Sequence, residues 1–247
     1  MFSNTTIDKN TPIPLYYQLK QIILDDIKNG HLTPGDMIPA ELELTKMFNL
    51  SRTTVRQAII ELVNEGHLYR IKGKGTFIAK PKIEQDFMTK IESFKEQMFR
   101  KGYTPSTKVL EKRILNATGD IAKNLVISEG DLTLKLKRLR YADSDPIVIV
   151  DTYLSANYCN HVYDYNLADV SLYDILSMKS ETKIVRIQRT VEASVAGKYE
   201  SDLLCIPEGF PIQIFHSIGY NTNNIPMEYS IAKYRGDMSK FKVTITL

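Results

Sequence analysis

Basic side chains are concentrated in one short window of this 247-residue chain. Residues 46–82 carry eight Lys or Arg side chains against two acidic ones, whereas the whole chain carries 32 basic and 29 acidic side chains, a formal net charge of +3. Residues 1–45 have a net charge of −3 and residues 83–247 a net charge of 0. Local positive charge is typical of a protein that binds a polyanion. A chance cluster on a solvated surface would give the same count, so charge alone leaves both interpretations open.

The residue types in this window suit contact with a nucleic-acid duplex. Arginine can form two parallel hydrogen bonds with guanine O6 and N7, and hydroxyl side chains at a helix N-terminus suit phosphate oxygens. Glycines beside lysines let a backbone come close to the duplex. The candidate DNA contacts are Ser51, Arg52, Thr53, Thr54, Arg56, Gln57, Lys72, Gly73, Lys74 and Gly75. The alternative is a small helical domain that contacts another protein through a solvated arginine face.

Apolar spacing and turn residues predict the elements that must position these candidates. Ser51 is a good N-cap for the helix that carries both arginines, and the Lys72–Gly75 turn has glycine where a hairpin needs positive φ. On the preceding helix we expect Leu44, Met47 and Phe48 to be buried. The predicted elements are helices at 15–27, 40–48 and 52–65 and strands at 67–71 and 76–79. This order predicts a winged helix-turn-helix, in which the third helix enters the DNA major groove.

Two further arginines lie on a predicted strand in the rest of the chain. Side chains alternate along a strand, so Arg138 and Arg140 share a face with Leu134 and Leu136. An arginine that lies partly over a core needs an anionic partner. The residues alone leave open whether that partner is a protein carboxylate or a bound phosphate.

A second predicted strand offers hydrogen-bonding groups to a small ligand. Glu228 and Tyr234 share one face, and the small residues Ser230 and Ala232 between them leave room. A carboxylate and a phenol suit sugar hydroxyls or an amine. An exposed strand face without a ligand is the alternative.

Runs of strands with interspersed short helices predict an α+β domain with a largely antiparallel sheet. The helix expected after the linker contains Met88, Ile91, Met98 and Phe99. Further helices are expected near 120–126, 172–178 and 198–204, and strands near 107–115, 133–141, 147–154, 183–195, 211–220, 227–235 and 240–246. We therefore predict two domains, a winged helix-turn-helix over 1–79 and a ligand-binding domain over 88–247, joined by a linker at 80–87.

Other function classes lack a sequence signature. No window of eighteen apolar residues and no apolar signal segment is present, so we expect a cytoplasmic protein without a membrane span. Cys159 and Cys205 lack the spacing of a disulfide scaffold or a zinc site. Asp143, Asp145 and Asp151 could suggest a divalent metal, although turn chemistry explains the first two better. HExxH, a phosphate loop and GxSxG are all missing, so we expect no catalytic residue, metal or cofactor.

The N-terminal part resembles the GntR family of bacterial transcription regulators. The strings PLYYQL and PGDMIPAELELTKMFNLSRTTVRQAIIELVNEGHLYRIKGKGTFIAK carry the likeness over about residues 14–80. Leu42 departs from the family, which often has a DNA-contacting arginine there within PSERELA. The resemblance implies operator contacts by Ser51, Arg52, Arg56 and Gly73 or Gly75.

The remainder, about residues 83–247, resembles the UTRA effector domain of the HutC subgroup, whose fold looks like that of chorismate lyase. The landmarks are SFKEQMFRKGYTPSTKVL, LKRLRYADSDPIVIVDTYL, SLYDIL and PMEYSIAKYRGD. Val150 stands where amino-sugar sensors have a glutamate, and Asp151 points to the other face, which argues against a specific assignment to N-acetylglucosamine 6-phosphate. The resemblance implies that a phosphorylated sugar is held by Ser93, Phe94, Arg138, Arg140, Ser171, Tyr173, Glu228 and Tyr234.

We therefore predict a ligand-responsive transcription regulator, with repression of sugar or amino-sugar uptake and catabolism genes as the first hypothesis. It would bind palindromic operator DNA as a homodimer and release it when a phosphorylated sugar effector binds. The helix expected near Met88 would couple the ligand pocket to the DNA-binding domain. The alternatives are an activator, a sensor of a non-phosphorylated organic acid or amino-acid derivative, and a chorismate-lyase-like enzyme with an attached DNA-binding domain.

Overall fold

The structure, a computed structural model, describes residues 6–244 and divides into two compact units. The first ends at Lys82 and the second begins at Ile83. This boundary differs from the linker predicted at 80–87, because strand β3 (Ile83–Gln85) already belongs to the second unit. β3 pairs in parallel with β10 (Ser239–Phe241), a contact between the two ends of the unit that local sequence patterns do not show.

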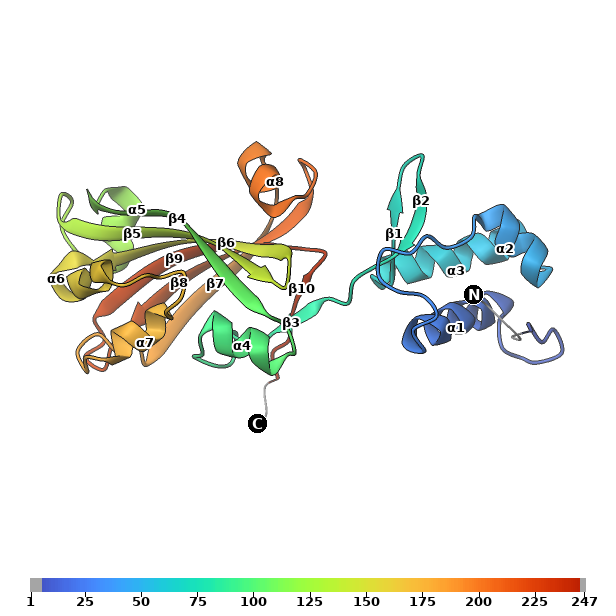
Figure 1. Ribbon diagram of the computed structural model, residues 1–247, viewed down its shortest axis with the longest axis horizontal. Helices are drawn as coiled ribbons and strands as arrows, with labels where there is room; N and C mark the ends of the chain where they lie inside the picture. The colour runs from blue at the N-terminus through green and yellow to red at the C-terminus, as the bar shows by residue number, and fades with distance from the viewer. Residues whose placement is uncertain (1–5, 245–247) are drawn as a thin grey trace. The chain divides into compact units, whose positions relative to one another are not determined.

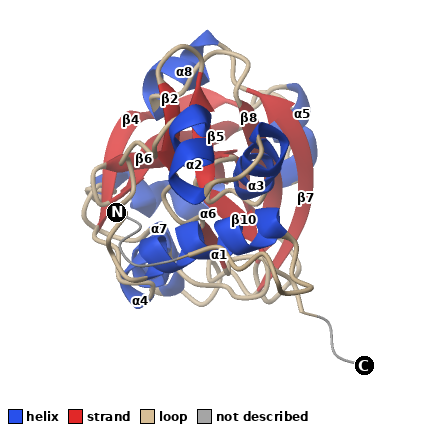
Figure 2. Cartoon of the chain, turned by 90° about the vertical axis from the view of Figure 1, so that its right-hand side faces the viewer, coloured by secondary structure: helices blue, strands red, loops and turns tan. Residues whose placement is uncertain are grey.

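The first unit contains three helices followed by a hairpin, which is the predicted winged helix-turn-helix (Figure 1). The helices run in different directions around a shared core that includes Leu19, Ile23 and Ile59 (Figure 2). Strands β1 and β2 pair antiparallel from Leu68 opposite Ile78 to Ile71 opposite Gly75. The elements are α1 (Leu15–Lys28), α2 (Glu41–Phe48), α3 (Arg52–Asn64), β1 (Leu68–Ile71) and β2 (Gly75–Ile78).

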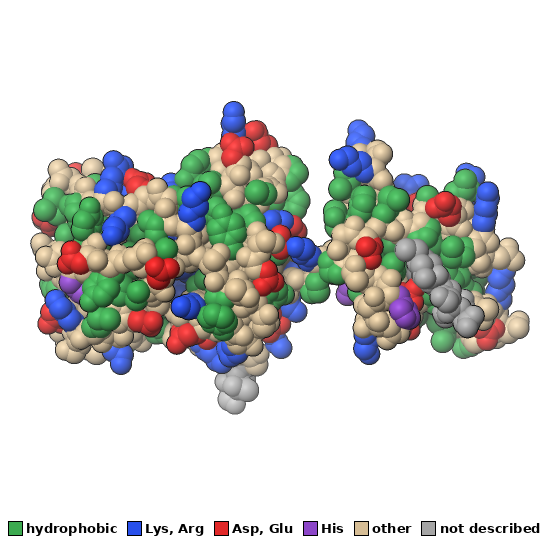
Figure 3. Space-filling view, in the orientation of Figure 1, with side chains coloured by type: hydrophobic (Ala, Val, Ile, Leu, Met, Phe, Trp, Pro, Cys, Tyr) green, Lys and Arg blue, Asp and Glu red, His purple; other side chains and the backbone are tan. Residues whose placement is uncertain are grey.

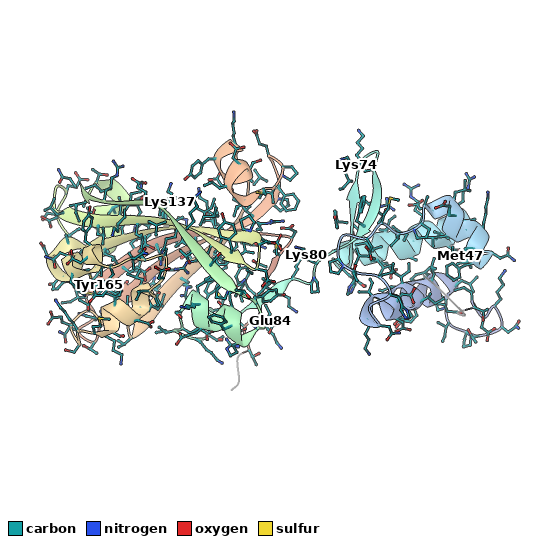
Figure 4. All side chains as sticks on the ribbon, viewed as in Figure 1. Met47, Lys74, Lys80, Glu84, Lys137 and Tyr165 are labelled. Carbon is teal, nitrogen blue, oxygen red and sulfur yellow. The ribbon has the colours of Figure 1, made fainter. Side chains whose placement is uncertain are left out.

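The ends of these helices follow the local sequence signals. The Ser51 hydroxyl accepts a hydrogen bond from the Thr54 backbone N–H at 3.1 Å, which makes Ser51 the N-cap of α3 as predicted. The expected burial of Met47 is wrong, because its side chain is 54% exposed at the surface of the unit (Figure 4). Leu44 and Phe48 lie one helical turn apart and form the buried stripe of α2, and Met47 lies outside that stripe near the helix end.

The second unit is built on a six-stranded sheet in the order β4-β5-β6-β9-β8-β7, with every neighbouring pair antiparallel. This confirms the predicted α+β class with an antiparallel sheet. The hairpin between β5 and β6 turns at Asp143, which has a φ of 54°. The strands are β4 (Pro105–Asn116), β5 (Leu132–Ala142), β6 (Asp145–Ser155), β7 (Arg186–Val195), β8 (Pro211–Tyr220) and β9 (Pro226–Arg235).

Helices cover both faces of this sheet (Figure 1). Apolar residues near α6 and α7 pack with Leu136 of β5, whereas Leu204 of α8 packs with Leu139. Because positions 136 and 139 point to opposite faces of β5, these helices lie on opposite sides of the sheet. The helices of the unit are α4 (Phe94–Arg100), α5 (Gly119–Leu125), α6 (Ala156–Cys159), η1 (Asn160–Asp164), α7 (Leu172–Ser177) and α8 (Lys198–Leu204).

The helix expected near Met88 begins later, at Phe94. Ser93 caps it, because its hydroxyl accepts from the Glu96 N–H at 3.2 Å while the Glu96 carboxylate accepts from the Ser93 N–H at 2.9 Å. Ile91 and Phe99, expected on its apolar face, are 46% and 56% exposed. The last strand is also shorter than the predicted 240–246, whose final two positions lie outside the described residues.

Candidate functional site

Helix α3 presents one polar and one apolar side. Val55, Ala58, Ile59 and Leu62 are buried. The side chains of Arg52, Thr53, Arg56 and Gln57 are exposed, as the sequence predicted. The predicted recognition residues therefore stand on the solvent side of the helix.

Four of the candidate contacts already form hydrogen bonds within the unit. The Ser51 hydroxyl lies 2.7 Å from that of Thr53 and 2.8 Å from that of Thr54, so three hydroxyl groups cluster at the start of α3. Gln57 Nε2 donates to Glu61 Oε1 at 3.0 Å. A base contact by Gln57 would have to replace this bond, whereas Arg52 and Arg56 extend freely from the helix.

The hairpin between β1 and β2 places cations at its tip. Lys72 and Lys74 are exposed there, and Lys74 marks the tip in Figure 4. Figure 3 shows Lys and Arg side chains gathered at this point. Gly73 has a φ of 77° and Gly75 a φ of 132°, which confirms the predicted need for glycine in the turn. A Cβ at Gly75 would also lie 3.0 Å from Met37 Sδ.

Not every cation in the basic window is available to a polyanion. Arg70 of β1 forms an ion pair with Glu41 of α2 at 2.7 Å. The neighbour of that glutamate, Leu42, is 48% exposed, so the position where the family often has an arginine presents an apolar side chain. The surface charge therefore comes from the α3 arginines and the hairpin lysines more than from the β1–α2 junction.

In the second unit, a cavity of about 370 Å³ lies over the sheet between α4 and α7. β5 and β9 form part of its floor, because their cavity-facing residues alternate as predicted. The residues that sequence reasoning assigned to an effector all line it: Ser93, Phe94, Arg138, Arg140, Ser171, Tyr173, Glu228 and Tyr234.

Arg138 and Arg140 lie side by side in this cavity without a carboxylate partner. Among residues 6–244, no Asp or Glu oxygen lies within ion-pair distance of either guanidinium, and neither Nε has a hydrogen-bond partner. Arg138 is 3% exposed and donates from Nη2 to Thr152 Oγ1 at 3.1 Å. Burial, followed by the charge of Arg140, lowers the pKa of Arg138. Buried charges of this kind favour an anion in the cavity.

Glu228 lies across the cavity with a neutral donor. Tyr173 Oη donates to Glu228 Oε2 at 3.0 Å, and burial raises the pKa of Tyr173, so the phenol keeps its proton. Burial raises the pKa of Tyr234 to about 12, against the opposing charges of Arg140 and Arg189. Ser230 and Ala232 line the space between Glu228 and Tyr234, as expected from their small size.

The two serines of the predicted site also serve the fold. Ser171 caps α7 through an acceptor bond from the Asp174 N–H at 3.4 Å, and the Ser93 hydroxyl bonds to Glu96. Phe94 lies beneath the Arg140 guanidinium, 5.1 Å from the ring centroid. The serine hydroxyls are thus fixed by helix capping at the cavity rim.

The position next to the arginines is apolar, as the sequence indicated. Val150 lines the cavity, whereas Asp151 lies on the other face of β6, 3.3 Å from Lys137 Nζ. The carboxylate of Asp151 is therefore out of reach of a ligand in the cavity.

Arg189, which was not among the predicted site residues, lines the cavity from β7. Its Nη1 donates to the Phe87 carbonyl oxygen, and the guanidinium lies 4.8 Å from the centroid of the Phe87 ring. A lone arginine on a mostly exposed strand carries no local signal of a binding role. Only the pairing of β7 with β8, which sets Arg189 opposite Ser217, shows where it lies.

Neither a candidate metal site nor a membrane-spanning helix is found in the part of the chain that the structure describes. No group of three or more His, Cys, Asp or Glu side chains there could hold a metal ion. Asp143, in the turn between β5 and β6, instead accepts a hydrogen bond at 2.9 Å from the N–H of Thr104, which precedes β4. Within residues 6–244, no helix is both long and apolar enough to cross a bilayer.

Both units match families of known proteins. Residues 15–78 match the model of bacterial regulatory proteins of the gntR family, and residues 100–240 match the UTRA domain. The chain belongs to the GntR family of bacterial transcription regulators. Its pair of domains is that of the HutC-type subgroup, and the resemblance noted in the sequence is confirmed.

Relatives of this GntR-family regulator match it over nearly their whole length. The HTH-type transcriptional repressor NagR of Bacillus subtilis (strain 168) is 34% identical over 235 residues, which cover 95% of this chain and 96% of NagR. A protein of Escherichia coli (strain K12) named "Probable fructoselysine utilization operon transcriptional repressor" is 28% identical over 233 residues, covering 94% and 93%. The crystal structure of PhnF from Mycobacterium smegmatis shows the same fold with a TM-score of 0.65 and 24% identity, covering 94% and 98%. The first two proteins are named as transcriptional repressors and not as enzymes, so the enzyme alternative is set aside.

Proposed function

We propose that this regulator is a repressor that binds a palindromic operator as a homodimer and releases it when a phosphorylated sugar occupies the cavity. The observation that carries the effector half is the pair of buried guanidinium groups, Arg138 and Arg140, that face a cavity and lack a carboxylate. Paired arginines bind phosphate oxygens through charge-assisted hydrogen bonds. Relatives named for repression, one of them for the use of a sugar derivative, support the same assignment.

The DNA-binding half rests on α3 and the hairpin. Arg52 and Arg56 are exposed near the N-terminal end of α3, the part of a recognition helix that reaches base edges. Lys72 and Lys74 at the hairpin tip would contact phosphates, and Ser51, Thr53 and Thr54 add hydroxyl donors at the helix start. A single winged helix reads few base pairs, so two copies on a symmetric operator would supply specificity.

Effector binding and operator binding would be coupled because the dimer has two states, and the effector and the operator each bind one state more tightly than the other. The segment between β3 and α4 is the candidate connection, because Phe87 lines the cavity and lies two residues after the end of β3. Since α4 begins only at Phe94, this role falls on the irregular residues 86–93 and not on a helix starting near Met88.

A gel-shift titration tests the DNA half. We expect Arg52→Ala and Arg56→Ala each to weaken binding to the cognate promoter by about 1–3 kcal/mol. Lys28→Ala, at the end of α1, is the matched control and leaves affinity nearly unchanged. Wild-type affinity in both arginine variants would rule out the proposed DNA-binding surface.

A thermal-shift screen of the full-length protein against sugar phosphates tests the effector half. A compound that binds only the folded protein raises the melting temperature, and Arg138→Gln should abolish that rise. Lys137→Gln is the control, because Lys137 is the next residue on β5 but points to the other face and pairs with Asp151. A response that survives Arg138→Gln would favour a sensor of non-phosphorylated ligands.

A further inference from the structure

A third guanidinium faces Arg138 and Arg140 from the far side of the cavity. Arg189 is on β7, the edge strand, and Arg138 is on β5. Four strand spacings separate them, about 19 Å between backbones. In the register of the sheet, Arg189 lies opposite Ser217, and Ser217 lies opposite Ser230. Both serines line the cavity, so the part of its floor next to Arg189 is polar.

Arg189 has only a weak partner in the structure. It donates to the backbone carbonyl of Phe87 and stacks on the Phe87 ring. In the described part of the chain, no carboxylate lies within ion-pair distance of its guanidinium. A carbonyl is a weaker partner for a guanidinium than a carboxylate, which accepts two parallel charge-assisted bonds. An acidic ligand group could therefore replace the carbonyl at Arg189.

The acidic residues around the cavity are engaged elsewhere. Glu92 forms an ion pair with Arg100 at 2.6 Å, and Asp169 accepts from Asn166 Nδ2 at 2.6 Å. Glu228 accepts from Tyr173. Position 150, a valine, adds no further carboxylate. The cavity therefore contains three guanidinium groups, and none of them is paired with an acidic side chain of a described residue.

The positive charges act on the centre of the cavity from both sides. Tyr234 and Tyr173 are both buried, and the charges of Arg140 and Arg189 oppose the rise in their pKa values that burial causes. A ligand seated over these phenols would therefore meet a cation at each end.

We propose that the effector carries two separated acidic groups, a phosphate bound by Arg138 and Arg140 and a carboxylate bound by Arg189. The ligand class is a phosphorylated sugar acid or a sugar phosphate with an acidic substituent. This inference rests on the proposed function and narrows its ligand. A neutral sugar would leave Arg189 on the Phe87 carbonyl, whereas an acidic one would draw it away from the segment that follows β3.

The test compares phosphorylated compounds that differ in one carboxylate. One pair is 6-phosphogluconate and glucitol 6-phosphate, which differ only at C1. The other is N-acetylmuramic acid 6-phosphate and N-acetylglucosamine 6-phosphate, which differ only in a lactyl group. Calorimetric titration uses the full-length protein as wild type, Arg189→Gln, Arg138→Gln and Arg186→Gln. Arg186 is the control on β7, where it is exposed and bonded to Asn224.

In at least one pair, the wild type should bind the carboxylated member at least about tenfold more tightly. Arg189→Gln should lower the affinity for the carboxylated compound to that of the compound without the carboxylate, whose own affinity should not change. Arg186→Gln should keep the preference for the carboxylated compound. Equal binding, or no binding, of both members of each pair would overturn the proposal. So would an equal loss for both members in Arg189→Gln, which would mean that Arg189 only supports the fold. Arg138→Gln should abolish binding of every compound; if the carboxylate preference fails while this dependence holds, the proposed function stands without the inference.

Discussion

Arg138 and Glu228 share a cavity and are both buried, yet they do not form an ion pair. Each is held by a neutral group, Arg138 by the Thr152 hydroxyl and Glu228 by the Tyr173 phenol. A direct pair would satisfy both charges and leave a ligand little to gain. Keeping the charges apart would leave a cation for the phosphate and an acceptor for the hydroxyl groups of the proposed effector.

The tyrosine that holds Glu228 should contribute to stability. Tyr173→Phe removes the only hydrogen bond described for a carboxylate that is 5% exposed. We expect the free energy of unfolding, measured by urea denaturation, to fall by about 1–3 kcal/mol. Tyr163→Phe is the control, since Tyr163 is exposed on η1. Equal midpoints for both variants would show that Glu228 does not depend on the phenol.

At the scale of elements, ion pairs join the end of α4 to Asp86, the residue that follows β3. Asp86 forms ion pairs with Arg100 at 2.7 Å and Lys101 at 3.1 Å, both at the C-terminal end of α4. Burial alone would raise the pKa of Asp86, but the hydrogen bonds from Arg100 and Lys101 outweigh it and hold the pKa below its usual value of 3.8. The ionised carboxylate therefore stabilises the folded state.

This contribution has a defined pH dependence. A carboxyl with a lowered pKa in the folded state stabilises the protein above its unfolded pKa, and the stabilisation is lost as pH falls through the folded value. At pH 7 we expect Asp86→Asn to cost about 1 kcal/mol, a modest figure because Arg100 is well exposed to solvent. The difference from wild type should shrink below about pH 3.8 in unfolding measurements across pH. Glu84→Gln, which removes a surface pair with Lys240, should change little at any pH.

The hairpin should act on DNA through charge alone. Lys74 lies at the tip of the hairpin between two glycines. It is distant in sequence from the α3 side chains that we expect to contact bases. Lys74→Gln should weaken binding to all DNA sequences alike and reduce the slope of log affinity against log salt by about one. Fluorescence anisotropy over a salt series measures this slope. A loss confined to the cognate operator would instead indicate base readout by the hairpin.

The start of helix α4 and the short α6–η1 segment were not predicted from local sequence patterns. Met88, Ile91, Met98 and Phe99 fit a helical spacing, but the capping box of Ser93 and Glu96 starts the helix at Phe94. The α6 and η1 turns are too short to show a periodicity. Helix α3 was predictable because its N-cap, its apolar stripe and the glycine after its end are all local sequence signals.

At the scale of the whole molecule, a pocket is assembled from residues far apart in the chain. Strand parity placed Arg138 with Arg140 and Glu228 with Tyr234, and the resemblance supplied the contacts from α4 and α7. Arg189 could not be found in this way, because its position depends on which strands pair across the sheet. Local alternation gives the face of a strand but not its neighbours.

The proposed dimer is also testable at this scale. Sedimentation should give twice the chain mass of 28.2 kDa at the concentrations used for DNA binding. An operator with two half-sites should bind much more tightly than a single half-site, because both winged helices then act together. Equal affinity for the two DNAs, with a monomeric mass, would contradict the symmetric mode of binding.

The parallel pairing of β3 with β10 has a consequence for synthesis of the chain. The winged helix-turn-helix is complete once residue 82 has emerged, but β3 then waits for a partner that begins at Ser239. At 5–20 residues per second, that delay is roughly 8–30 s. We expect β3, the strand that follows the DNA-binding unit in the sequence, to be among the last parts of the nascent chain to fold. Truncation of the chain near residue 239 would therefore disturb the beginning of the effector domain.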